Sequence, residues 1–228
     1  MAVDRERARI GRPQLVALLA LGVVAAVAIG FALGFLARTT VLGGNDSNPA
    51  ADSVDVGFAQ DMSVHHQQAI DMSSIAMTNA VDPLVRNLAF DMLTSQQNQV
   101  GQMQGWLAIW DRAAVGSDGY MGWMSADEHG HSMSSMANDS GGPVAAMPGM
   151  ASTDELAALR QATGPAVDVM FLQLMLRHHE GGLSMMEYAS DHAETPALKQ
   201  LAAKMISTQQ GESTLMTQML TEKGAQPL

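Results

Sequence analysis

Two segments of the chain are related by one offset of 113 residues, without a gap. Between residues 58–107 and 171–220, sixteen of fifty positions are identical in the same register. The pairs that carry chemistry are Met62/Met175, His65/His178, His66/His179, Met72/Met185, Met92/Met205 and Met103/Met216. An internal repeat of this length indicates that one supersecondary unit was duplicated, and that the two copies bury their apolar faces against each other.

Each copy carries the start signals of two helices. A side chain that can cap a helix stands just before a proline at Asp82-Pro83 and again at Thr195-Pro196. A capping-box pattern stands upstream of the second copy, at Ser152 and Glu155. A Gly-Pro pair at residues 164 and 165 breaks or kinks the chain before the long helix resumes. We therefore expect helices near 53–79, 83–112, 153–192 (interrupted at 164) and 196–223. The fold class predicted is all-α, a four-helix bundle made of two duplicated helical hairpins, preceded by one N-terminal transmembrane helix.

Within each copy, six residues recur at alternating spacings of four and three, which is the spacing of an inward-facing helical stripe. They are Phe58, Met62, His65, Ala69, Met72 and Ala76, then Phe171, Met175, His178, Gly182, Met185 and Ala189. Adjacent helix residues point about 100° apart, so we expect His66 and His179 at the flank of the buried stripe. A plain structural interpretation is that the histidines are core residues hydrogen-bonded to Gln99 or Glu212.

The N-terminal part of the chain is directed to a membrane. Residues 14–37 are uncharged and almost wholly apolar, and about 20 such residues span a bilayer. Arginines before the span favour a cytoplasmic N-terminus and an exported body, in a bacterial cell membrane crossed once. A cleaved signal peptide is the alternative, although its apolar core is usually about 7–15 residues long. The predicted parts are 1–13 basic N-terminus, 14–37 anchor, 38–52 tether and 53–224 bundle, with hairpin one at 53–112, a connector at 113–151 and hairpin two at 152–224.

Charge and cysteine content exclude several classes of function. The net charge is -11, and residues 1–38 hold five of the twelve basic residues but only two of the 23 acids. The body is therefore strongly acidic and repels nucleic acid. Cysteine is absent, which removes disulfides, thiolate metal sites and thiol nucleophiles.

The connector at 113–151 combines methionine and histidine with flexible small residues. The chain has 19 methionines, six of which lie in this connector without helical periodicity. The densest group of soft ligands there is His129, His131, Met133 and Met136. Thioether sulfur suits Cu(I), and imidazole binds copper in both oxidation states. The alternative is a loop that docks its methionines on the bundle or on a partner.

Other metals and enzyme classes fit less well. Structural zinc does not use methionine, and calcium or magnesium needs clustered oxygens that have no recognisable spacing here. A di-iron bundle needs Glu-x-x-His on two helices, and residues 58–107 contain no glutamate. No phosphate loop or nucleophile elbow occurs, so we expect no enzyme activity.

The doubled F-x-x-x-M-x-x-H-H motif, the MPGM segment at 147–150 and the two QQ-x5-M pieces resemble a bacterial family, the domain of unknown function 305 (DUF305) group. The resemblance covers roughly residues 53–224 and implies a ferritin-like four-helix bundle. It also implies copper ligands at the matching His and Met positions, because some members are exported copper-binding proteins. Gly182 departs from the first copy, which has Ala69 at the matching position.

The resulting hypothesis is a membrane-anchored copper-binding protein for copper storage, transfer or resistance, with Cu(I) preferred over Cu(II). The candidate ligands are Met62, His65, His66, Met72, Met175, His178, His179, Met185, His129, His131, Met133 and Met136. Binding needs neutral imidazole, so we expect affinity to fall as the pH drops through about 6.5. The alternatives are a metal-free accessory subunit of a membrane complex and a methionine-rich oxidant sink. A membrane-protein partner or a homo-oligomer stays open.

Overall fold

Helices carry almost all of the ordered structure in the computed structural model, which describes residues 29, 30, 32, 48–124 and 143–228. From residue 48 onward the helices are α2 (Val54–Asn79), α3 (Pro83–Ile109), α4 (Thr153–Gln161), α5 (Pro165–His192) and α6 (Pro196–Glu222). The described residues contain no strand, only a bridge between Tyr120 and Val144. The all-α prediction is confirmed, and the helix bounds agree with the expected ones to within three residues.

Most of the predicted anchor, residues 14–37, and most of the tether lie outside the described residues. Of the first 47 residues only Ile29, Gly30 and Ala32 are described, and they are helical. No helix among the described residues is long and apolar enough to cross a membrane.

The helix starts follow the predicted signals with one exception. Asp82 accepts the Leu84 N–H at 2.9 Å, and Ser152 with Glu155 forms the reciprocal capping box. Gly164 has φ 61°, so the chain turns between α4 and α5 at a conformation that glycine adopts without strain. The expected cap by Thr195 is wrong, because its side chain makes no capping hydrogen bond to α6.

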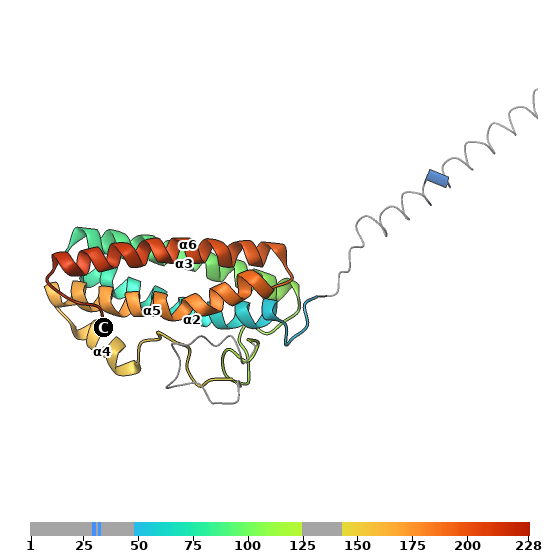
Figure 1. The fold of residues 1–228 in the computed structure, drawn as a ribbon, viewed down its shortest axis with the longest axis horizontal. Helices are drawn as coiled ribbons and strands as arrows, with labels where there is room; N and C mark the ends of the chain where they lie inside the picture. Colours follow the sequence, from blue (N-terminus) through green and yellow to red (C-terminus); the bar gives the residue numbers. More distant parts are fainter. Residues whose placement is uncertain (1–28, 31, 33–47, 125–142) are drawn as a thin grey trace, which may run out of the picture. The chain divides into compact units, whose positions relative to one another are not determined.

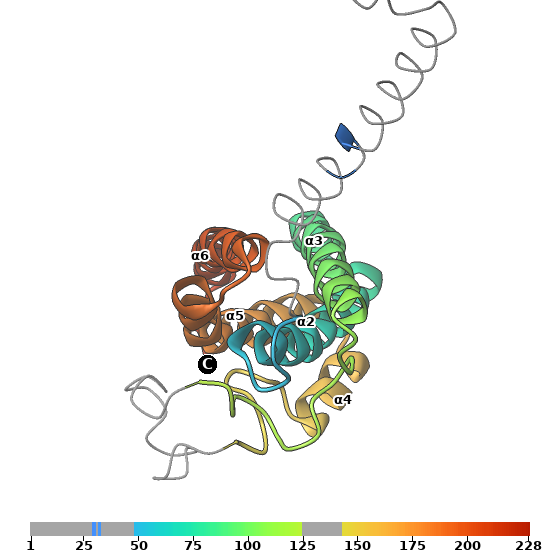
Figure 2. The ribbon, with the colours of Figure 1, turned by 90° about the vertical axis from the view of Figure 1, so that its right-hand side faces the viewer.

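The four long helices form two hairpins that join along one pair of helices. α2 packs against α3, α5 packs against α6, and the hairpins meet where α2 crosses α5. In Figure 1, α3 and α6 form one layer and α2 and α5 the other, with α4 outside the second layer. Figure 2, which looks along the bundle, shows α3 and α6 apart from each other on either side of the α2–α5 pair.

The core divides into two apolar clusters, one on each side of the histidines. Met62 of α2 and Met185 of α5 belong to the first cluster, whereas Met72 of α2 and Met175 of α5 belong to the second. Along each helix the His-His pair lies between its two methionines. The layout has the symmetry expected of two antiparallel copies that meet at the histidines.

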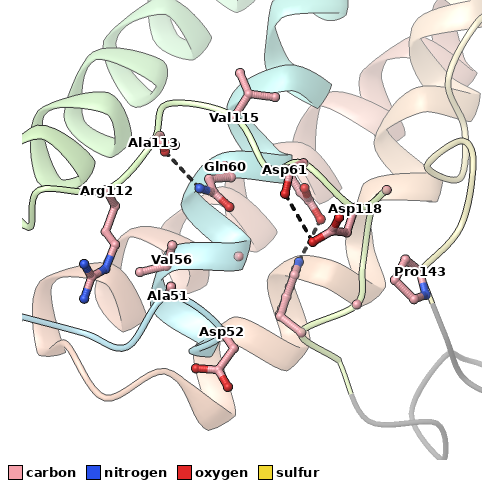
Figure 3. A pocket seen from close by; sticks show the side chains of 16 residues that line it. Ala51, Asp52, Val56, Gln60, Asp61, Arg112, Ala113, Val115, Asp118 and Pro143 are labelled. Carbon is pink, nitrogen blue, oxygen red and sulfur yellow. Dashed lines mark hydrogen bonds between the residues drawn. The ribbon is translucent and has the colours of Figure 1, made fainter.

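A buried carboxylate, Asp61, holds the first part of the connector on the bundle. Asp61 accepts the backbone N–H of Met121 at 2.7 Å and the indole N–H of Trp123 at 2.8 Å. It lies at the wall of a hollow of about 520 Å³ that Arg112 and Pro143 also line (Figure 3). Burial raises the pKa of the Asp61 carboxyl, although both donors oppose that shift. Asp61 therefore anchors the connector to α2, together with Gln60, which donates to the Ala113 carbonyl at 2.9 Å.

The described connector methionines are core residues, which corrects the expectation that packing cannot explain them. Met121, Met124 and Met147 are buried in the first apolar cluster, and Met150 packs against it. For this part of the connector the docking alternative holds, because the loop lays its thioethers onto the bundle.

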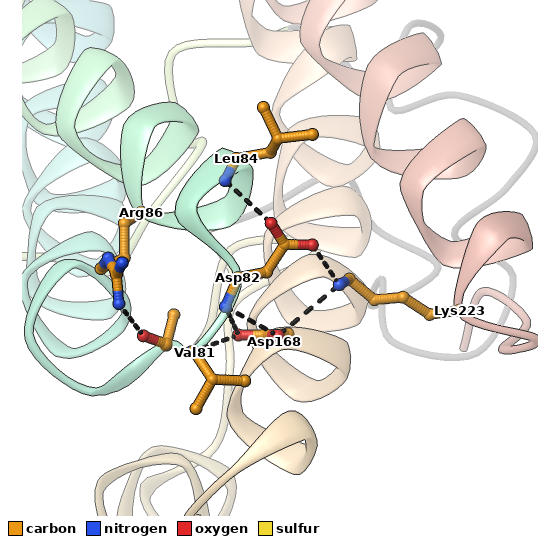
Figure 4. A network of polar contacts seen from close by, with 7 residues as sticks. Val81, Asp82, Leu84, Arg86, Asp168 and Lys223 are labelled. Carbon is orange, nitrogen blue, oxygen red and sulfur yellow. Dashed lines mark hydrogen bonds and ion pairs between the residues drawn. The ribbon is translucent and has the colours of Figure 1, made fainter.

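Each hairpin caps a helix of the other hairpin. Asp55 in α2 accepts the N–H groups of Glu194 and Thr195, both at 2.8 Å, at the start of α6. Asp168 in α5 accepts the N–H groups of Val81 and Asp82 at the start of α3 (Figure 4). There Lys223 forms ion pairs with the carboxylates of Asp82 and Asp168. Asp55 and Asp168 are themselves separated by 113 residues and are 1% exposed. These crosswise caps tie the hairpins together at both ends.

Candidate metal centre

Two imidazoles meet at the centre of the α2–α5 contact. The ring centroids of His65 and His178 are 3.8 Å apart, with 33° between the ring planes. His66 and His179 are also buried, and none of the four residues is more than 2% exposed. The second histidine of each pair lies at the flank of the α2–α5 seam, and an outer helix buries it there. His66 faces α3 and His179 faces α6, so each helix of the inner pair buries one histidine toward each neighbour.

Backbone carbonyls fix the tautomer of the central pair. The Nε2–H of His178 donates to the carbonyl oxygen of His65 at 3.0 Å, and the Nε2–H of His65 donates to that of Pro148 at 3.2 Å. A carbonyl only accepts, so Nε2 carries the proton in both rings and Nδ1 of each neutral ring keeps its lone pair.

Side chains of the outer helices fix the other two imidazoles. His66 Nε2 lies 2.7 Å from Oε1 of Gln99 in α3, and His179 Nε2 lies 2.7 Å from Oε2 of Glu212 in α6. The amide and carboxylate oxygens accept, so these rings also donate from Nε2. Sequence analysis named Gln99 and Glu212 as partners, and the structure assigns them to His66 and His179.

All four Nδ1 atoms are buried and have no hydrogen-bond partner. A buried polar atom without a partner costs about 1–3 kcal/mol, so four in one cluster need an explanation. An imidazole that donates one N–H to a carbonyl or carboxylate and leaves the other nitrogen bare has the arrangement of a metal ligand with its supporting contact. The donor set therefore fits a metal ion that imidazole binds.

Burial favours the neutral, metal-binding form of three of these rings, those of His65, His66 and His178, by lowering their pKa values. It lowers the pKa of His65 to about 4 and that of His66 to about 3, and it lowers the pKa of His178 well below its usual value. Pro148 and Gln99 oppose the shift by accepting from the first two rings, but desolvation is larger. Proton competition for His65 and His66 is therefore expected near pH 4 and below, instead of near 6.5.

Glycines bring the MPGM segment and α5 close to the central pair. A Cβ atom on Gly182 would lie 3.0 Å from Cε1 of His65, so the glycine makes room for that ring. Gly149, with φ 75°, contacts Gly181 and the backbone at His178 so closely that its own Cβ would lie 2.5 Å from the Arg177 oxygen. This close approach explains why residues 149 and 181 are glycines, and it puts the Pro148 carbonyl within hydrogen-bond distance of His65.

The bundle methionines surround the imidazoles as fully buried core residues. Met62, Met72, Met175 and Met185 are 0% exposed, so the structure brings eight of the twelve predicted ligands into one interior. The other four, His129, His131, Met133 and Met136, lie outside the described residues. Among the described residues, no three His, Asp or Glu side chains already converge as a ligand set.

Sequence reasoning missed several polar residues of this interior. Gln96 and Gln209, separated by 113 residues, are buried and have side-chain atoms without partners, as do the four imidazoles. Asp55 and Asp168 were missed because the repeat was compared only from residue 58. The preceding Val-Asp-Val triplets, residues 54–56 and 167–169, repeat at the same offset and would have revealed the pair.

The family comparison matches most of the bundle. Residues 55–220 match the family described as "Domain of unknown function (DUF305)". A DUF305 protein from Streptomyces coelicolor, described as secreted, is similar at 41% identity and a TM-score of 0.68, over 78% of this chain and 99% of that chain. A DUF305 fragment from Deinococcus radiodurans is similar at 30% identity and a TM-score of 0.57, over 74% of this chain and 96% of that one.

A third solved protein shares the fold at lower identity. CopM in its Cu(I)-bound form is 24% identical, with a TM-score of 0.53, over 74% of this chain and 96% of that chain. CopM has also been solved in Cu(II)-bound, silver-bound and apo forms. No curated protein matches the chain.

Proposed function

The chain belongs to the DUF305 family, and from that premise we propose that its bundle binds copper, with Cu(I) preferred, for storage, transfer or resistance outside the cytoplasm. The observation that carries the proposal is the set of four buried imidazoles with supported Nε2–H groups and unpartnered Nδ1 atoms. A packed core gains nothing from four such atoms, whereas a bound cation uses each of them.

The surrounding chemistry supports the preference for Cu(I). Soft thioethers of Met62, Met72, Met175 and Met185 line the two apolar clusters that flank the histidines. Thioether and imidazole ligands together select Cu(I) among the common cell metals. We infer that the protein holds its ion by soft coordination and performs no bond-making reaction.

The relatives support the ligand and the compartment. CopM, which shares the fold, binds Cu(I), Cu(II) and silver ions in its solved forms. The Streptomyces coelicolor relative is described as secreted, which agrees with an exported bundle tethered through residues 14–37. We propose this anchored topology from the apolar stretch and the arginines that precede it.

The proposal is tested by an anaerobic Cu(I) competition titration of the full-length protein. The variant changes His65, His66, His178 and His179 to alanine, and the matched control is His192→Ala. His192 lies on α5, as His178 and His179 do, but it is exposed at the end of that helix, where its Nδ1 is hydrogen-bonded to the Tyr188 carbonyl. Tight binding that is lost in the folded quadruple variant and kept in the control would support the bundle site.

Two results would contradict the bundle site. Binding that is unchanged in the folded quadruple variant would move the site to the connector. No binding by the wild-type protein would overturn the copper function and favour an interaction module. If the quadruple variant fails to fold, the pair His66→Gln and His179→Gln decides, because glutamine preserves a buried hydrogen-bonding side chain.

A further inference from the structure

We propose that the two copies of the histidine site prefer different oxidation states of copper. Specifically, the half-site of His179 and Glu212 favours Cu(II), whereas the half-site of His66 and Gln99 favours Cu(I). The inference rests on the proposed function, because it assumes that the buried imidazoles bind copper.

The first observation is a difference of charge at constant geometry. His66 and His179 occupy equivalent positions of the repeat, and each has its Nε2 2.7 Å from an oxygen at the equivalent position of the facing helix. In one copy that oxygen belongs to a neutral amide and in the other to a carboxylate. The two hydrogen bonds have the same length, and they join equivalent helices of the repeat, α2 to α3 and α5 to α6.

A carboxylate behind an imidazole changes what the opposite nitrogen can bind. It makes the ring more basic, and it places a negative charge near the metal in a region of low dielectric. Cu(II) carries one charge more than Cu(I), so the carboxylate stabilises Cu(II) more. The amide of Gln99 accepts the same hydrogen bond without that charge. At His66 the soft thioethers therefore determine which oxidation state of copper is preferred.

The second observation is that the His179 half-site faces a groove. A pocket of about 250 Å³ between α5 and α6 is lined by His179, Glu180, Gln209 and Ser213 among others. Gln209 is 5% exposed and its counterpart Gln96 in the first copy is 2% exposed; the Oε1 of each has no partner, so the amide oxygen is common to both half-sites, whereas the groove lies at that of His179. Cu(II) favours tetragonal sites with nitrogen and oxygen ligands, and the groove can add solvent oxygen to the amide oxygen that both copies offer. Cu(I) does not need these oxygen ligands.

The two observations favour the same half-site independently. The charge of Glu212 and solvent oxygen from the groove both stabilise the harder ion at His179. The central pair, His65 and His178, is enclosed between the methionine clusters and suits the softer ion. A protein built in this way can hold copper in either oxidation state without rebuilding its ligand set.

The test is a reciprocal exchange in the full-length protein, with Glu212→Gln, Gln99→Glu and the double exchange. Cu(I) affinity is measured by anaerobic competition with a chromophoric chelator, and Cu(II) affinity by competition together with electron paramagnetic resonance. We expect Glu212→Gln to weaken Cu(II) binding about 10–100-fold and Cu(I) binding much less. This raises the Cu(II)/Cu(I) potential by about 59 mV for each tenfold change. Gln99→Glu should strengthen Cu(II) binding and add a second Cu(II) signal.

The controls separate tuning from structure. Glu212→Asp keeps the charge and should retain the Cu(II) preference if it folds, as judged by circular dichroism and urea unfolding. Equal changes in the two affinities on Glu212→Gln would make Glu212 a structural residue and overturn the inference, while leaving the proposed function intact. If Glu212→Gln does not fold, an unchanged affinity ratio in Gln99→Glu overturns it. A wild-type protein that binds neither ion would overturn the proposed function itself.

Discussion

Gly182 determines how closely α5 approaches the imidazole of His65. The His65 ring is stacked on His178 at 3.8 Å and cannot easily yield to a Cβ atom that would lie 3.0 Å away. Overpacking of a tight core costs about 1–3 kcal/mol, whereas alanine in place of a helical glycine gains about 0.5–1 kcal/mol. We expect Gly182→Ala to destabilise the protein by about 1 kcal/mol in urea unfolding.

Gly211 is the matched control, because it also lies inside a helix but a Cβ there would meet nothing within 4 Å. Gly211→Ala should stabilise the protein by about 0.5–1 kcal/mol. Equal stabilisation by both substitutions would show that the histidine stack has room to shift.

The buried histidines predict a loss of stability in mild acid. Their pKa values in the folded protein, about 4 for His65 and about 3 for His66, lie below the unfolded value near 6.5. Between these values the unfolded chain binds more protons, so stability is fully present above about pH 6.5 and falls as the pH decreases. Two such groups cost about 3 kcal/mol between pH 6.5 and 5.

Urea unfolding of the metal-free protein at these two pH values measures this loss. The window is informative because Glu155, whose pKa Arg177 lowers to about 2, stays ionised throughout it. Asp61, whose pKa is raised by burial, changes stability in the opposite direction. His65→Gln should reduce the pH dependence, and a stability that is flat over this window in the wild type would contradict the prediction.

At the scale of the elements, the crosswise caps explain why α6 starts where it does. Asp55→Ala would leave the N–H groups of Glu194 and Thr195 without their acceptor at a part-buried site. An unsatisfied buried group costs about 1–3 kcal/mol, so we expect a loss of about 2–3 kcal/mol in the free energy of unfolding. Asp91→Ala, on the exposed face of α3, should change it by less than about 0.5 kcal/mol. Equal effects would show that Asp55 does not act as a cap.

Three methionines of the connector, Met121, Met124 and Met147, are part of the core. Met121 is fully buried in the first apolar cluster, so Met121→Ala should destabilise the protein by about 2–5 kcal/mol. Its copper stoichiometry should not change. Met77→Ala is the control, since that side chain is 39% exposed. A folded Met121 variant with unchanged stability and less bound copper would make Met121 a ligand instead.

The helices were predictable from local signals, whereas their long-range partners were not. Proline, Asp82 and the Ser152–Glu155 pair act within a few residues, so the sequence reveals the starts of α3, α4 and α5. Thr195 looked equally suitable as a cap, but the acceptor for α6 comes from Asp55, 140 residues away. Periodicity likewise identified the stripe that contains His65 and His178. It could not predict that the outer helices, α3 and α6, bury His66 and His179.

On the scale of the whole molecule, a copper ion at the histidines would link the two hairpins. The hairpins meet along α2 and α5, where the central imidazoles come from opposite sides. A ligand at a hundred times its Kd adds about 2.7 kcal/mol of stability. We expect Cu(I) to raise the Tm and to slow amide exchange in α2 and α5 more than in α4. The quadruple histidine variant should show neither effect, and a Tm that Cu(I) leaves unchanged would contradict a site between the hairpins.

The repeat predicted the symmetry of the bundle but not the point where symmetry fails. His178 donates to the His65 carbonyl, yet His65 donates to Pro148 and not to the equivalent carbonyl of His178. The connector supplies that acceptor, and no sequence pattern announces a backbone oxygen as a partner. A sequence difference that accompanies this asymmetry beside the central rings is Gly182, where the first copy has Ala69.

The exchange of Asp55 and Asp168 between hairpins has a consequence for how two such hairpins can assemble. Each copy carries the carboxylate that the other needs, so a lone hairpin would lose the acceptor of two N–H groups at the start of its second helix. Two separate hairpins could exchange these acceptors only as an isologous dimer, whose twofold axis would pass between the two hairpins. In a single chain that holds both copies this axis is only a pseudo-axis, which permits the two sides to differ, as Gln99 and Glu212 do.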